Sequence, residues 1–197
     1  MAKKKRKKEK TIFVVVEGIR EKIFIEFLAE LFDPNQTIKL KFHPEYGGSS
    51  DAILDRALKN DFYNKVFAIF DEDDKLSKDR IDILKLRWGE QIPSSVNDSL
   101  LYKYNKRNCN PIVIVSTPLS IEGVLIRLLG KTLPLFASPL LDSNNIKYNK
   151  RIIKSTLSGI LGGINEIEYY RNHITKEDVL EKAERIPELK LMLKIFE

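Results

Sequence analysis

The stretch TIFVVVEGIREKIFIE, from Thr11 to Glu26, decides the fold. Its residues 12–16 are all β-branched or aromatic, which is typical of a strand buried on both faces of a parallel sheet. The run ends at Glu17 and Gly18. Beyond the glycine, apolar residues recur with a period of about 3.6, which predicts an amphipathic helix. Its apolar positions are Ile23, Phe24, Phe27, Leu28, Leu31 and Phe32. The stretch therefore predicts a buried strand that ends in a carboxylate, turns on a glycine and leads into a helix.

Charge is distributed unevenly along this chain of 197 residues, whose formal net charge is +6. Residues 1–10 contain seven of the 34 Lys and Arg residues and one of the 28 Asp and Glu residues, so the remainder is neutral overall. We expect this basic tail to be disordered through self-repulsion and to suit the binding of nucleic-acid phosphates, with a solubilising role as the alternative. Its candidate phosphate-binding residues are Lys3, Lys4, Lys5, Arg6, Lys7 and Lys8.

Length and composition are typical of one soluble domain, alone or with a helical extension. No apolar run approaches the roughly 18 residues that a membrane helix needs, and the N-terminus lacks the apolar segment of a secretory signal. The single cysteine, Cys109, excludes an internal disulfide and suits a reducing compartment. These features predict a cytoplasmic protein with no membrane partner.

Strand and helix patterns alternate along the first two thirds of the chain. Strands are predicted at 12–16, 37–42, 66–70 and 112–115, and helices after Gly18 and at 52–58, 77–88 and 119–129. The strand at 37–42 alternates polar and apolar residues, as an edge strand does, and Ser50 or Asp51 is the expected N-cap of the helix that follows. This order predicts an α/β fold with a mainly parallel, Rossmann-like, four-stranded sheet flanked by helices.

Two regions give weaker patterns. Residues 89–110 are polar and read as an insertion or a long connection, with a short helix at 96–104 as one option. Residues 131–149 are loop-rich, and helices are predicted at 150–163, 166–172, 176–185 and 188–196, with a capping box at Thr175. The expected organisation is a tail at 1–10, an α/β domain at 11–130, and a helical extension at 131–197 packed on it.

Acidic residues follow three of the predicted strands. Glu17 follows the first strand, Asp71 and Asp73 follow the third, and Glu122 follows the fourth, while Glu21 lies four residues beyond Glu17. Parallel strands bring these ends to one edge of the sheet, where ligands of α/β folds bind. Clustered carboxylates repel one another, and a divalent cation resolves that conflict. Oxygen ligands without His or Cys favour Mg²⁺ or Mn²⁺ over zinc.

The segments VVVEG at 14–18 and DED at 71–73 resemble the Toprim fold, which topoisomerases, bacterial primases, OLD-family nucleases and small defence proteins share. The resemblance covers about residues 11–130. The E-G-x-x-E spacing of Glu17 and Glu21 resembles the OLD-type version, and Glu122 resembles a further acid used there. The lysine-rich start and the segment STPLSIEGVLIRLL at 116–129 resemble RloB-like and abortive-infection proteins.

This resemblance implies a Mg²⁺-dependent (or Mn²⁺-dependent) endonuclease that cleaves DNA or RNA, with tRNA among the candidates. It implies that Glu17, Asp71 and Asp73 hold one ion and that Glu21 and Glu122 complete a second site, so that two ions stabilise the attacking and leaving oxygens. The topoisomerase branch implies instead that Glu17 acts as a general acid or base.

In such a nuclease, further residues would contact the substrate's phosphates. Arg20 or Lys22 would offset charge on the scissile phosphate, and Gly47 and Gly48 would let backbone amides approach a phosphate. Anti-phage defence, with an ATPase as a candidate partner, is the setting that the resemblance implies. Oligomerisation is left open.

Two other functions remain as alternatives. One is a non-catalytic module that binds nucleic acid or a protein through the tail and the helices. The other is a primase-like or phosphate-transferring enzyme, for which the chain lacks room for an added catalytic domain. The acids also have simpler explanations, since Asp71, Asp73 and Glu122 suit helix N-termini and Glu21 suits pairing with nearby lysines.

Overall fold

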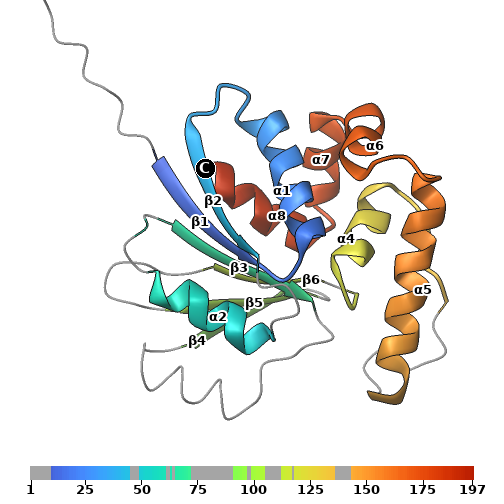
Figure 1. The fold of residues 1–197 in the computed structure, drawn as a ribbon, viewed down its shortest axis with the longest axis horizontal. Helices are drawn as coiled ribbons and strands as arrows, with labels where there is room; N and C mark the ends of the chain where they lie inside the picture. The colour runs from blue at the N-terminus through green and yellow to red at the C-terminus, as the bar shows by residue number, and fades with distance from the viewer. Residues whose placement is uncertain are drawn as a thin grey trace, which may run out of the picture.

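The computed structural model describes residues 10–44, 49–60, 63, 65–71, 91–96, 99–104, 112–116, 118–135 and 143–197. Four strands run parallel: β1 (Lys10–Val16), β2 (Ile38–Pro44), β3 (Lys65–Asp71) and β6 (Ile112–Ser116). Two more run antiparallel: β4 (Gln91–Val96) and β5 (Ser99–Tyr104). Together they form a six-stranded sheet of order β2-β1-β3-β6-β5-β4 (Figure 1). The four predicted parallel strands are therefore confirmed.

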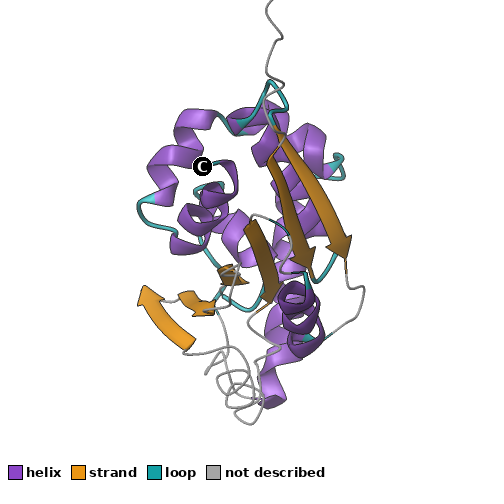
Figure 2. Ribbon diagram, turned by 90° about the vertical axis from the view of Figure 1, so that its left-hand side faces the viewer, coloured by secondary structure: helices purple, strands orange, loops and turns teal. Residues whose placement is uncertain are grey.

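Helices cover both faces of the sheet. They are α1 (Ile19–Phe32), α2 (Ser50–Lys59), α4 (Ile121–Leu128), α5 (Ser143–Leu161), α6 (Glu166–His173), α7 (Lys176–Ala183) and α8 (Pro187–Leu193), followed by a short 3₁₀ turn, Lys194–Phe196. Of the described helices, α2 packs on one face, and the others gather on the opposite face (Figures 1 and 2). None of the described helices is long and apolar enough to cross a membrane.

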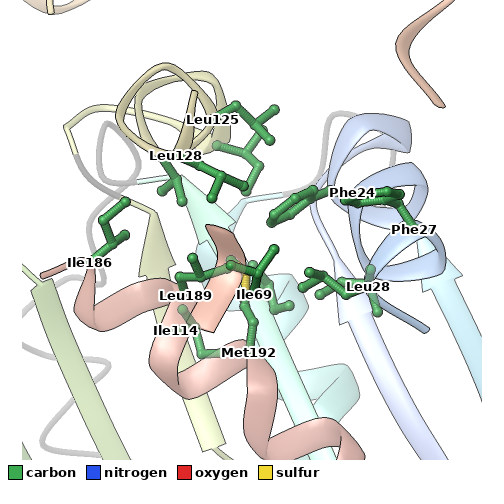
Figure 3. Packing of buried hydrophobic residues seen from close by; sticks show 14 of the residues in the cluster. Phe24, Phe27, Leu28, Ile69, Ile114, Leu125, Leu128, Ile186, Leu189 and Met192 are labelled. Atoms are coloured by element: carbon green, nitrogen blue, oxygen red, sulfur yellow. The ribbon is translucent and has the colours of Figure 1, made fainter. Parts of the chain in front are cut away.

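The period of two along the strands divides the core into two layers. On β1, Ile12, Val14 and Val16 face the larger helical layer, whereas Phe13 and Val15 face α2. Figure 3 shows the larger layer, in which side chains of α1, α4 and α8 meet those of the central strands. The labelled residues are Phe24, Phe27, Leu28, Ile69, Ile114, Leu125, Leu128, Ile186, Leu189 and Met192. The uninterrupted apolar run of β1 therefore reflects burial on both sides.

Two sequence predictions about local structure were wrong. In place of the helix offered for 96–104, residues 99–104 form strand β5, which pairs antiparallel with β4 so that Leu100 lies opposite Ser95. The pairing of the two strands continues as far as Val96 opposite Ser99. Helix α2 is capped by Ser49, whose hydroxyl accepts from the Ala52 N–H, rather than by Ser50 or Asp51.

The remaining predictions about local structure have different outcomes. Strand β2 lies at the sheet edge as predicted, and the capping box at Thr175 is confirmed, with Asp178 as its second member. Helix α5 begins at Ser143, seven residues before the predicted start at 150, inside the stretch read as a loop. The predicted helix at 77–88 and the basic tail at 1–9 lie outside the described residues.

Candidate functional site

Backbone hydrogen bonds bring Glu17 and Asp71 together at the carboxyl ends of β1 and β3. The Glu17 N–H donates to the Ile69 carbonyl at 3.2 Å, which extends the parallel pairing past β1. The Asp71 N–H donates to Glu17 Oε2 at 2.8 Å. The N–H of Ile121, the first residue of α4, donates to Asp71 Oδ1 at 3.0 Å. Two strand ends and one helix start are thus joined through two carboxylates.

Glu21 and Glu122 enter the same place from the first turns of α1 and α4. Their side chains are buried, with 4% and 3% of the residue surface exposed. Close backbone approach makes this possible: a Cβ on Gly123 would lie 2.5 Å from the Pro118 carbonyl oxygen, and one on Gly18 would lie 3.1 Å from Glu21 Oε2. The glycines beside these acids therefore allow the tight packing that buries them.

Basic side chains from α1 and α5 surround the acids. Lys150 Nζ lies 2.9 Å from Asp71 Oδ2 and 3.9 Å from Glu17 Oε1. Arg20 bridges two acids: it donates from Nη1 to Glu122 Oε1, and from Nε to Glu166 Oε1 at 2.7 Å. The ammonium of Lys154 lies 3.9 Å from Glu122 Oε1.

All of these groups except Lys150 line a cleft of about 340 Å³. Its lining residues are Glu17, Gly18, Ile19, Arg20, Glu21, Ile23, Asp71, Ile121, Glu122, Lys154 and Glu166. An adjoining hollow of about 390 Å³ shares Arg20, Ile23 and Glu166 with it. One carboxylate oxygen of Glu122 and one of Glu166, the Oε2 atom in each, are buried without a hydrogen-bond partner. Buried carboxylate oxygens left in this state favour a ligand that supplies positive charge or donors.

A larger hollow, of about 530 Å³, lies between α1 and β2. Its acids are already satisfied: Glu30 accepts from Arg171 Nε at 2.8 Å, and Asp33 accepts from the Thr37 hydroxyl at 2.7 Å and from the Ile38 N–H at 2.7 Å. It therefore makes the weaker candidate for a site.

Crowding of carboxylates shifts their pKa values. Burial raises the pKa of Glu21 to about 7, and the charges of Glu122 and Glu17 add to the rise. Burial and the same kind of repulsion, from Glu17 and Glu21, hold the pKa of Asp71 well above its usual range, against the opposing effect of Lys150. Glu122 differs. Burial would raise its pKa, but the Ser120 hydroxyl, its own backbone N–H and the charges of Arg20 and Lys154 bring it below the usual value.

Whether these residues fit a divalent cation can be judged from the donors. In the part of the chain that the structure describes, no group of three or more His, Cys, Asp and Glu side chains is arranged to hold a metal ion. The ammonium of Lys150 lies near both strand-end acids, 3.9 Å from Glu17 Oε1 and 2.9 Å from Asp71 Oδ2. The donors themselves are carboxylate oxygens with excess negative charge, which fits Mg²⁺ or Mn²⁺. Asp73 lies outside the described residues.

The other predicted site residues fall elsewhere. Lys22 does not line the cleft: its ammonium lies 3.6 Å from Glu26 Oε1 and 5.9 Å from the centre of the Phe42 ring. Gly47, Gly48 and the tail residues Lys3 to Lys8 are outside the described residues. Three residues at the cleft were not foreseen, namely Lys150, Lys154 and Glu166. A run of bases without acids in the sequence of α5 was the available signal for the two lysines.

Comparisons of the chain with protein-family models, with curated proteins and with solved structures find no match. What the cleft can do is therefore inferred from its own residues.

The pKa of Glu21 gives a prediction for metal-free protein. Between its usual pKa near 4.5 and the folded value of about 7, the folded state binds more protons than the unfolded state, so stability falls as pH rises. In EDTA, wild type should lose on the order of 1–3 kcal/mol more than Glu21→Gln between about pH 5 and pH 8. Urea unfolding at both pH values measures this. Equal losses in the two proteins would contradict it.

Proposed function

We propose that this protein is a Mg²⁺-dependent phosphodiesterase of the Toprim type that cleaves DNA or RNA internally. The observation that carries the proposal is the convergence of Glu17, Glu21 and Asp71 at the ends of β1 and β3 and in the first turn of α1. Burial, with repulsion between the acids added to it, raises the pKa of Glu21 and Asp71. Its place at the carboxyl ends of parallel strands supports a ligand site. The VVVEG segment at the end of β1 and Asp71 at the end of β3 support the Toprim resemblance.

Glu17 and Asp71 would hold the ion, with Asp73 as a further ligand and with Glu21 and Glu122 beside them. A bound Mg²⁺ would supply Lewis-acid stabilisation of charge on the phosphate. In the overall reaction water adds to phosphorus and one P–O ester bond breaks, which leaves one phosphate end and one hydroxyl end. Lys150 would have to leave Asp71 Oδ2, since two cations cannot share that oxygen at short range.

The remaining charges suggest how substrate would be placed. The guanidinium of Arg20 is bound to Glu122 and Glu166, so in this proposal it orders the acids rather than contacting phosphate. The side chain of Lys154 is 49% exposed and lines the cleft, so it is the better candidate for neutralising a phosphate there. A cytoplasmic setting, anti-phage defence and an ATPase partner remain proposals that follow from the sequence resemblance.

One observation favours a second function, the non-catalytic binding module. Lys150 already neutralises Asp71 at 2.9 Å, and a charge-compensated acid cluster needs no metal. In that case the same surface would bind nucleic acid or a protein without cleaving it.

One experiment separates the two. The full chain is incubated with plasmid, single-stranded DNA, structured RNA and tRNA, in Mg²⁺, Mn²⁺ or EDTA, and metal binding is followed by calorimetry. We expect cleavage of at least one substrate that depends on the metal. Metal binding without cleavage of any substrate, together with nucleic-acid binding, would favour the binding module. Absence of metal binding would overturn the proposed function.

A further inference from the structure

Helix α5 carries several positively charged side chains, and the acids of the cleft pair with only some of them. Its sequence, SNNIKYNKRIIKSTLSGIL, contains Lys147, Lys150, Arg151 and Lys154 and no acidic residue. Outside residues 1–10 the chain as a whole is neutral, so this helix holds a local excess of bases. Figure 1 shows α5 at the outer side of the molecule, next to α4.

The bases of α5 lie on one side of the helix. At about 100° per residue, positions 147, 150, 151 and 154 fall within roughly 100° of arc. The sector of the helix next to this arc is held in the core by Ile153 and Leu157, which are buried. The basic side cannot turn inward without exposing these apolar residues, so the helix presents a fixed stripe of bases.

This stripe follows the wall of the cleft. Lys150 reaches Asp71, and one turn further on Lys154 reaches towards Glu122. Beyond them Ser158, on the same side, lines the adjoining hollow. On the solvent side of the helix, Lys147 and Arg151 are exposed and make no ion pair within the described part of the chain. Positively charged side chains therefore extend from the edge of the cleft over the exposed surface of α5.

An aromatic side chain stands beside the exposed bases. Tyr148 is 57% exposed, and its ring makes no aromatic contact with other described residues. A nucleobase can stack on such a ring only if the face of the nucleobase is available, as it is in a single strand. Lysine and arginine beside an exposed aromatic ring form the combination that single-stranded nucleic acids bind.

We propose that the exposed face of α5, formed by Lys147, Tyr148, Arg151 and Lys154, binds a single-stranded segment of nucleic acid. Lys147 and Arg151 bind its phosphates, Tyr148 stacks on a base, and Lys154 directs the backbone into the cleft towards Glu17 and Asp71. This inference rests on the proposed function for the destination of the strand, but binding by α5 itself needs no catalysis.

The test is a binding measurement in EDTA, with fluorescently labelled oligo(dT) and oligo(U) of about 15 nucleotides and a duplex of equal length. The full-length proteins compared are wild type, Lys147→Gln/Arg151→Gln, Tyr148→Ala and the control Lys190→Gln. Lys190 is an exposed lysine of α8 whose ammonium lies 3.6 Å from Glu184 Oε2. All four proteins carry the same basic tail, so differences between them report α5 or the control position.

We expect the double variant to lower the slope of log K against log salt by about 1.4 on the single strands, because each lost phosphate contact removes about 0.7. Tyr148→Ala should weaken single-strand binding about tenfold and duplex binding much less. Lys190→Gln should leave both the slope and the affinity unchanged. An unaltered slope in the double variant, or equal losses in the control, would overturn the inference, as would an equal effect of Tyr148→Ala on duplex.

The outcomes also separate this inference from the proposed function. Binding that depends on α5, without cleavage in any metal, would sustain the inference and remove the nuclease. Cleavage that is unaffected by the α5 variants, with unaltered binding, would sustain the nuclease and remove the inference.

Discussion

Asp71→Asn is expected to abolish metal-dependent cleavage by this protein. Asp71 is the strand-end acid that contacts both Glu17, through its N–H, and the first turn of α4, through Oδ1. A metal ion supplies several kcal/mol of stabilisation to the developing charge. Since each 1.36 kcal/mol is tenfold in rate, loss of a main ligand should lower cleavage by at least about 10³-fold.

The folded state should survive this change. Asparagine retains an oxygen that can accept from the Ile121 N–H, and it removes a charge that burial and Glu17 and Glu21 oppose. Thermal unfolding of wild type and variant in EDTA checks that point, and cleavage rates in Mg²⁺ check the first. Glu168→Gln, at an exposed position of α6, is the matched control and should cleave at the wild-type rate. A folded Asp71→Asn protein that cleaves within about tenfold of wild type would show that the metal site lies elsewhere.

The sequence predicted the central strands and the strand-end acids because both follow from local patterns. The run at 12–16 is apolar because β1 is buried on both faces, and Glu17 and Asp71 come directly after their strands. Parallel pairing alone then brings these acids to one edge. The structure adds a direct contact, from the Asp71 N–H to Glu17, that no spacing in the sequence could specify.

The antiparallel pair β4 and β5 was missed because its residues give no clear period. Strand β4 contains Pro93, Ser94 and Ser95, so its sequence does not alternate clearly between apolar and polar residues. The segment was therefore predicted to be an insertion, although it contains two strands that extend the sheet beyond β6. Long-range charge pairing was missed for another reason. Arg20 meets partners 102 and 146 residues away in the sequence, and only packing of the C-terminal helices against α1 and α4 determines such pairs.

Arg20→Met is expected to be among the most destabilising single changes at the site. Arg20 bridges Glu122, which is 3% exposed, and Glu166. Without the guanidinium, the buried carboxylate of Glu122 and the half-buried carboxylate of Glu166 lose the cation that bridges them. Lys154, 3.9 Å from Glu122 Oε1, then remains beside Glu122. Removing one partner of a buried pair costs about 3–5 kcal/mol, and the lower end applies here because the Arg20 side chain is 27% exposed.

Urea denaturation of Arg20→Met measures this loss, and two further proteins identify its cause. Arg171→Met breaks a pair of similar geometry, with Glu30, on the solvent side of the same helix α1, and it should change stability little because both partners are exposed. Adding Glu122→Gln and Glu166→Gln to Arg20→Met removes the uncompensated charges and should recover much of the loss, since neutral amides cost less to bury than unpaired carboxylates. If the triple variant stays as unstable as Arg20→Met, the loss comes from the packing of the arginine stem, and Arg20 is no electrostatic bridge. If it recovers, the loss is electrostatic, and Arg20 acts as a bridge between α1, α4 and α6. The same bridge then holds the carboxylates of Glu122 and Glu166 in place at the cleft.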